Sequence, residues 1–239
     1  MEVLDDSQPA QELWNEIQLF AARFLRPFSD LDGFPEADLL AAQRRLNLQL
    51  PTTLFEFYRR FASARNIWSK QDPLLTPDEF IVRDGVLLFE FENQGNWRIG
   101  IRLADLAQAD PPVVWDGAWY QGHEDTPISV LAPSVSMFAV NMLAYVAKIA
   151  QRADHPAVGY TKDAASCLSA LWDCFPRCKL RDNWVVGPVA YFQSQDTFIE
   201  VSRADGYVYP ILMGEAATER FLGIVEQVPF EWIEPPDTA

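Results

Sequence analysis

Hydrophobic positions in the first quarter of the chain repeat with the period of an α-helix. Within residues 9–25, 35–46 and 50–61, apolar side chains stand three or four positions apart. This spacing places them on one face of a helix. Pro35 and Pro51 lie near the starts of the second and third ranges, where the first turn of a helix accepts a proline. The pattern therefore predicts three amphipathic helices.

The period then changes to short runs rich in β-branched and aromatic residues. These runs occupy residues 79–82, 86–91, 97–101 and 112–116. Such composition predicts strands. Asp84-Gly85 separates the first two runs and favours a tight hairpin turn.

The stretch Glu92-Asn93-Gln94-Gly95-Asn96 connects two of the predicted strands. We interpret it first as a turn, in which Gly95 and Asn96 tolerate positive φ and Asn93 and Gln94 bond the local backbone. A direct contact with a partner and a catalytic role stay open as alternatives.

The second half of the sequence alternates between the two periods again. A helix is predicted from Ser134, as its N-cap, to Gln151, and residues 152–160 are interpreted as a junction. The remaining predicted elements are a helix at 163–175, strands at 184–192, 197–202 and 207–213, and a helix at 215–228. We expect the acidic tail, residues 231–239, to fray.

This order of elements predicts an α+β fold, with helices packed on a mostly antiparallel central sheet. Residues 1–152 form the predicted core with its N-terminal helix. Residues 160–239 form a predicted C-terminal extension of helix and strands, either a separate domain or part of the same one.

Composition changes the picture mainly through charge. The 239 residues are 49% hydrophobic and include 8 Trp, enough for a sizeable core. The net charge of −15 disfavours direct binding to nucleic acid and favours a basic partner. Solubility alone is an equally good explanation of the acidity. No apolar run reaches the ~18 residues needed to span a membrane, and the acidic start lacks the features of a secretory signal, so we expect a cytoplasmic protein.

The sequence offers little familiar catalytic chemistry. Common nucleotide-binding, zinc-protease and serine-hydrolase motifs do not occur in it. Cys167, Cys174 and Cys178 lack the paired spacing of a zinc site and instead continue a helical stripe, so we predict core cysteines, no metal and no cofactor.

The segment that starts at the end of the fourth predicted strand, residues 115–127, is rich in aromatic and acidic residues. Trp and Tyr often anchor protein interfaces, which makes this segment our candidate partner-binding site. The predicted contact residues are Trp115, Asp116, Trp119, Tyr120, Glu124 and Asp125. An alternative is a hydrolase that uses His123 as a base with Asp116 or Glu124. The acidic residues before position 40 form a further candidate surface, which could imitate a nucleic-acid backbone and cover a nuclease cleft.

The order of several short motifs resembles the SMI1/KNR4 (SUKH) superfamily over roughly residues 33–150. The matching residues are Leu46, Leu50, Pro51, Phe57, Tyr58, Glu92, Asn93, Gln94, Trp97, Gly100, Ile101, Asp110, Pro111, Pro112 and Val113. The chain departs from the family pattern at Gln43 and Arg44, where an acid is common, and in the extension after residue 160.

The resemblance implies an α+β fold with a central sheet. It also implies an immunity protein that neutralises a cognate polymorphic toxin, often a nuclease, by occluding it without catalysis. The alternative is a general scaffold or regulatory module that binds cellular proteins. The family supplies no catalytic residues to transfer.

Overall fold

The computed structural model describes residues 10–68, 72–116, 127–154, 157–175, 178–181 and 187–236. It divides into two compact units. The N-terminal unit comprises Gln8–Val146, and the C-terminal unit comprises Ala147–Ala239 together with Met1–Ser7. The division falls within one helix, α5 (Val135–Asp154), a few residues before the predicted junction at 152–160.

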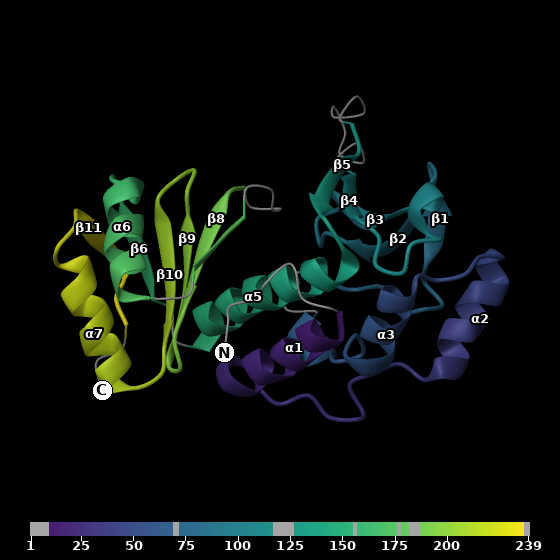
Figure 1. Cartoon of the computed structure of the whole chain (residues 1–239), viewed down its shortest axis with the longest axis horizontal. Coiled ribbons are helices and arrows are strands. Elements are labelled where there is room, and N and C mark those ends of the chain that lie inside the picture. The colour runs from purple at the N-terminus through teal and green to yellow at the C-terminus, as the bar shows by residue number, and fades with distance from the viewer. Residues whose placement is uncertain are drawn as a thin grey trace. The chain divides into compact units, whose positions relative to one another are not determined.

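The N-terminal unit places helices against a five-stranded sheet (Figure 1). Its helices are α1 (Ala10–Phe24), α2 (Glu36–Leu46), α3 (Thr52–Arg60), the short α4 (Arg65–Trp68) and most of α5. Its strands are β1 (Ile81–Arg83), β2 (Val86–Phe91), β3 (Arg98–Arg102), β4 (Val113–Asp116) and β5 (Ser129–Ala132). A 3₁₀ turn at Leu103–Asp105 directly follows β3. The strands pair in chain order, and every pair is antiparallel.

Aromatic side chains join the helices of this unit to its sheet. The rings of Trp14 in α1 and Phe57 in α3 stack with centroids 6.2 Å apart. The Tyr58 hydroxyl donates a hydrogen bond to the Phe89 carbonyl of β2 (3.0 Å), and the Phe89 ring meets Phe138 of α5 edge-on at 5.4 Å. The helical periodicity in the sequence therefore corresponds to burial against one sheet face.

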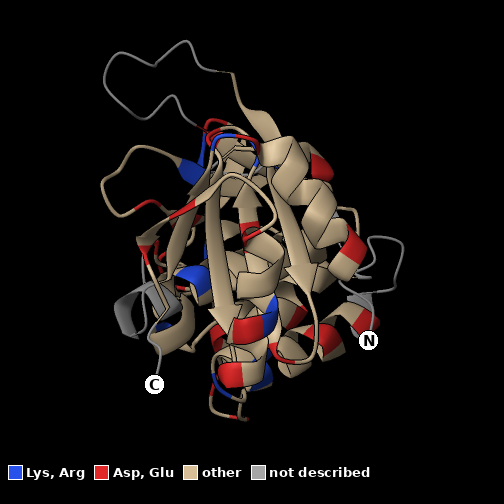
Figure 2. Ribbon diagram, turned by 90° about the vertical axis from the view of Figure 1, so that its left-hand side faces the viewer, with Lys and Arg blue, Asp and Glu red and all other residues tan. Residues whose placement is uncertain are grey.

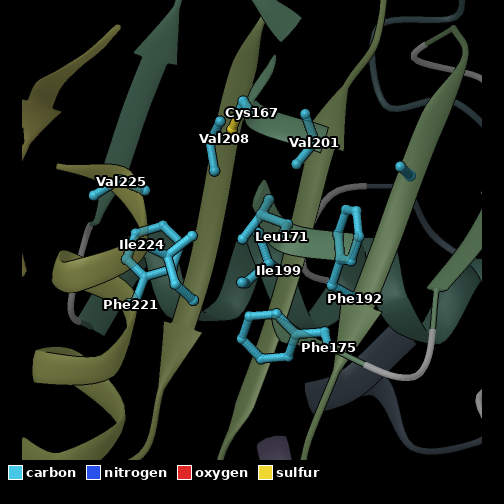
Figure 3. Close-up of a cluster of buried hydrophobic side chains, with 11 residues drawn as sticks. Cys167, Leu171, Phe175, Phe192, Ile199, Val201, Val208, Phe221, Ile224 and Val225 are labelled. Atoms are coloured by element: carbon cyan, nitrogen blue, oxygen red, sulfur yellow. The ribbon is translucent and has the colours of Figure 1, made fainter. Parts of the chain in front are cut away.

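The C-terminal unit has a six-stranded antiparallel sheet in the order β11-β6-β10-β9-β8-β7. The strands are β6 (Val158–Thr161), β7 (Cys178–Arg181), β8 (Val189–Gln193), β9 (Thr197–Ser202), β10 (Tyr207–Leu212) and β11 (Phe230–Glu234), and the helices are α6 (Ala164–Cys174) and α7 (Glu215–Val225). Figure 3 shows the core of the unit, where Leu171 of α6 and Phe221 of α7 pack with Ile199, Val201 and Val208 of the sheet.

A buried ion pair lies on the other face of β9, since Glu200 alternates with the core residues Ile199 and Val201. The Lys148 Nζ, near the end of α5, is 2.6 Å from Glu200 Oε1, and both side chains are buried. The same ammonium lies 4.7 Å from the centre of the Tyr209 ring. This pair fixes the last turns of α5 to the sheet of the C-terminal unit.

The predicted α+β class is confirmed, but several details differ. There are two sheets rather than one central sheet. The predicted junction contains the start of β6. The tail expected to fray, residues 231–239, contains all of β11 except its first residue, and Phe230 and Trp232 of this strand pack on the core. Cys167 is buried in the core as predicted. The three cysteines do not continue one helical stripe, however, because α6 ends at Cys174, which is exposed, and Cys178 begins a strand.

None of the described helices combines the length and the apolar run that crossing a membrane requires.

Candidate functional site

The stretch from Glu92 to Asn96 is a turn, and Glu92 organises it. One carboxylate oxygen of Glu92 accepts hydrogen bonds from the amides of Gln94 (2.9 Å) and Asn96 (2.8 Å). Gly95 has φ +78°, whereas Asn96 does not take a positive φ. The turn itself was predicted, but the side chain that bonds the local backbone is that of Glu92 rather than Asn93 or Gln94.

Two further carboxylates are buried near this turn in the N-terminal unit. Asp72 accepts a hydrogen bond from the Asn93 amide (3.1 Å). Burial raises the pKa of Asp72 and raises the pKa of Glu90 well above its usual range, with the negative charge of Asp72 adding to the effect on Glu90. Because Glu90 is only 1% exposed and Asp72 3%, neither carboxyl is accessible to a substrate from solvent.

The predicted contact residues start at the end of β4. Trp115 is half-buried. Asp116 is 4% exposed, and its carboxylate accepts a hydrogen bond from Arg98 Nη2 (2.8 Å). A partner would therefore reach Asp116 only if this buried ion pair opened.

The other predicted contact residues, Trp119, Tyr120, Glu124 and Asp125, lie outside the described residues. So does His123, on which the hydrolase alternative depends. Both hypotheses about this segment stay predictions.

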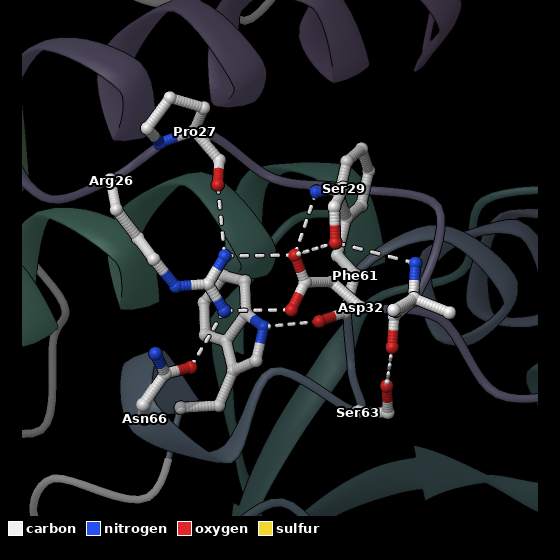
Figure 4. Close-up of polar contacts among 9 residues, drawn as sticks. Arg26, Pro27, Ser29, Asp32, Phe61, Ser63 and Asn66 are labelled. Carbon is white, nitrogen blue, oxygen red and sulfur yellow. Dashed lines mark hydrogen bonds and ion pairs between the residues drawn. The ribbon is translucent and has the colours of Figure 1, made fainter.

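A second candidate surface surrounds the connection between α1 and α2, among the acidic residues before position 40 that the sequence indicated. Its centre is the carboxylate of Asp32, shown in Figure 4. The Asp32 oxygens accept hydrogen bonds from Arg26 Nη1 and Nη2 (2.8 and 2.7 Å) and from the amide and hydroxyl of Ser29 (2.7 and 3.0 Å). Arg26 also donates to Oδ1 of Asn66 in α4 (2.7 Å). We call residues 26–32 the braced loop.

The ion pair of the braced loop is electrostatically strong. The hydrogen bonds from Arg26, and secondarily those from Ser29, lower the pKa of Asp32 to about 2 despite its burial. A forked guanidinium–carboxylate contact gives both strength and geometric definition. The carboxylate of Asp32 therefore stays ionised and holds the loop at neutral pH.

Leu31 is presented to solvent by this loop. Its amide donates to Ser29 Oγ (3.3 Å), and its carbonyl accepts a hydrogen bond from Ser63 Oγ (3.1 Å). The leucine side chain is nevertheless 88% exposed. The backbone of Leu31 is thus fixed on both sides while its side chain contacts almost nothing.

A polar pocket of about 450 Å³ adjoins the braced loop. It is lined by Gln18, Phe28, Ser29, Asp30, Arg59 and Arg60. The two arginines share the carboxylate of Glu56, to which Arg59 donates at 3.1 and 2.7 Å and Arg60 at 3.0 Å. Much of their positive charge is therefore balanced within α3, and the pocket presents groups of both signs.

Negative charge is distributed over both units. The N-terminal unit has 18 Asp and Glu against 11 Lys and Arg, and the C-terminal unit has 16 against 8. Residues 27–43 contain four acidic residues and no basic one. Figure 2 shows the side on which α6, α7 and β11 lie; the exposed acids there include Glu215, Glu219, Glu226, Glu231 and Glu234.

The described residues contain no group of three or more His, Cys, Asp or Glu side chains that could hold a metal ion. Comparisons with known proteins give no identification either: no family model, no curated protein and no solved structure matches the chain.

Proposed function

We propose that the chain is a non-enzymatic binding protein of the immunity type, which neutralises a basic toxin domain by covering its functional surface one-to-one. The observation that carries this proposal is the acidic surface. Exposed carboxylates occur on α1, α2, α7 and β11, so both units present negative charge. The resemblance of residues 33–150 to the SUKH superfamily supports the same function.

A nuclease is the toxin class that suits this surface best. Nucleases bind phosphate groups through Lys and Arg, and a protein with exposed carboxylates can occupy the same basic groups. Complementary charge also accelerates encounter and disfavours acidic competitors. An immunity protein benefits from both effects, because it must reach its toxin before the toxin reaches its substrate.

The test is co-expression of the full chain with the product of the neighbouring gene, followed by purification of the complex and an activity assay. We expect capture of a basic domain in a 1:1 complex and loss of that domain's toxic activity. Capture of an unrelated host protein without inhibition would favour the scaffold alternative and would contradict the proposal.

A matched pair of variants makes this assay sharper. Neutralising the exposed acids of α7, with Glu215→Gln, Glu219→Gln and Glu226→Gln, is expected to weaken inhibition. Neutralising the exposed bases Lys162 and Arg220 with Gln is expected to leave inhibition unchanged or improve it. Equal inhibition by both variants and the unmodified chain would exclude α7 from the electrostatic contact.

A further inference from the structure

We propose that the braced loop is a preformed docking element and that Leu31 is its apolar anchor, which enters a hollow on the partner rimmed by Lys and Arg side chains. This inference rests on the proposed function, since it names the part of the N-terminal unit that the basic partner contacts. It concerns a surface about 85 residues away in sequence from the predicted contact segment 115–125.

The first argument is the contrast between the backbone and the side chain of Leu31. The loop is tied by the Arg26–Asp32 ion pair, by Ser29, and by two bonds from Ser63, whose amide donates to the Asp32 carbonyl at 2.9 Å. The Leu31 side chain, by contrast, is 88% exposed, so it contributes little to the stability of the loop. A rigid loop that presents an apolar side chain loses little conformational entropy when it binds.

The second argument is the charge around the anchor. Within residues 27–43 the acids are Asp30, Asp32, Glu36 and Asp38, and all except Asp32 are exposed. Because Arg26 balances Asp32, the exposed negative charge of residues 27–43 comes from Asp30, next to Leu31 in the sequence, and from Glu36 and Asp38 of α2. Arg59 and Arg60 line the pocket next to Asp30, but both donate to the carboxylate of Glu56. An apolar centre with an acidic rim is complementary to an apolar hollow with a basic rim. A second copy of the chain would bring like charges together, so it is not the proposed occupant.

The experiment places a photo-crosslinking phenylalanine analogue at position 31 of the full chain in the cells from which the chain comes. The control places it at position 165, since Ala165 is an exposed residue of α6 in the C-terminal unit. Crosslinked proteins are identified by mass spectrometry. We expect an adduct with a protein of net positive charge at position 31, none at position 165, and loss of the adduct when Asp30→Lys and Asp38→Lys reverse the rim charge.

Four outcomes would overturn the inference: no adduct at position 31, an adduct with a second copy, an adduct with an acidic protein, or equal adducts at both positions. As a second readout, Leu31→Ser is expected to weaken the affinity for the crosslinked protein at least tenfold, whereas Leu31→Met retains it. Because the side chain is exposed, neither change should alter the unfolding transition.

These results separate the inference from the proposed function. Toxin inhibition that survives Leu31→Ser unchanged would refute the anchor and leave the immunity function standing. A crosslink from position 31 to a basic protein that has no toxic activity would support the anchor and refute the immunity function.

Discussion

At the residue scale, the Asp32 carboxylate decides whether the braced loop keeps its shape. Its pKa is lowered to about 2 in the folded chain, so it binds fewer protons there than in the unfolded chain. The resulting stability is fully present above pH ~4 and is lost as the pH falls towards 2. Asp32→Asn should lower the free energy of unfolding by ~2 kcal/mol at pH 7, with a smaller difference at pH 3.

Urea denaturation at both pH values measures this effect. The exposed Asp38→Asn serves as the control, and we expect it to change the free energy of unfolding by less than ~0.5 kcal/mol. A loss from Asp32→Asn that was equally large at pH 3 and pH 7 would show that packing, rather than charge, holds the loop.

The pKa of Glu90 is shifted in the opposite direction from that of Asp32. Its pKa is raised by burial and by the charge of Asp72, so the folded chain binds more protons than the unfolded chain. Stability is greatest below the ordinary pKa of a glutamate and declines as the pH rises through the raised pKa. Glu90→Gln should therefore stabilise the protein at pH 7, by about 1 kcal/mol or more, and change little at pH 4. A thermal unfolding series from pH 4 to pH 8 measures it; destabilisation throughout that range would contradict the assigned direction.

At the scale of elements, Gly100 permits the close approach of β3 and β2. A Cβ at this position would lie 2.3 Å from the Leu87 carbonyl oxygen, a backbone atom that cannot move aside without shifting the strand. Gly100→Ala should cost about 1–3 kcal/mol. Gly223 in α7 is the matched control, because a Cβ there meets no atom within 4 Å and Gly223→Ala should stabilise the helix by about 0.5–1 kcal/mol. Calorimetry of the two variants tests whether Gly100→Ala destabilises the protein and Gly223→Ala stabilises it. A Gly100→Ala variant as stable as the unmodified protein would refute the steric argument.

The buried ion pair between Lys148 of α5 and Glu200 of β9 joins these two elements. Each charge is balanced by its partner on the other element. Lys148→Met leaves Glu200 buried and unpaired, which should cost about 3–5 kcal/mol. Lys148→Met combined with Glu200→Leu removes both charges and should cost clearly less. A double-mutant cycle in urea measures the coupling. Additive losses would mean that the ion pair contributes through packing alone.

The sequence made some elements predictable because their signal is local. The apolar repeats of α1, α3 and α5 and the Asp84-Gly85 turn, with φ +51° and +77°, depend on neighbours within a few residues. Strand β11 does not: it forms because Phe230 packs where Gly159 of β6 leaves room, and a Cβ on Gly159 would lie 1.9 Å from the Phe230 ring. That contact joins residues about 70 positions apart.

The candidate site shows the same limit. The turn at 92–96 was predictable from its Gly and Asn, but the burial of Asp116 depends on Arg98 of the neighbouring strand. The braced loop resembled an ordinary Pro, Asp and Gly connection, because Ser63 and Asn66, which complete its hydrogen bonds, lie more than 30 positions away. The one local signal of its ion pair was Arg26, the basic residue that directly precedes the acidic stretch of residues 27–43.

At the scale of the whole molecule, net charge governs association with a basic partner. Long-range attraction acts mainly on the encounter rate and is screened by salt, since the Debye length falls from ~10 Å at 0.1 M to ~3 Å at 1 M. The association rate constant with the captured partner should therefore fall on the order of tenfold between 0.05 and 0.5 M NaCl. The dissociation rate should change much less, because short-range contacts such as the proposed Leu31 anchor determine it.

Stopped-flow measurements across this salt range test whether salt changes the association rate much more than the dissociation rate. The α7 triple variant, Glu215→Gln with Glu219→Gln and Glu226→Gln, should reduce the slope of the association rate against salt, whereas Leu31→Ser should keep the slope and raise the dissociation rate. An association rate independent of salt would refute electrostatic capture. A salt slope that is kept in the triple variant but lost when Asp30→Lys and Asp38→Lys reverse the charge near Leu31 would show that the steering charge lies around the braced loop rather than on α7.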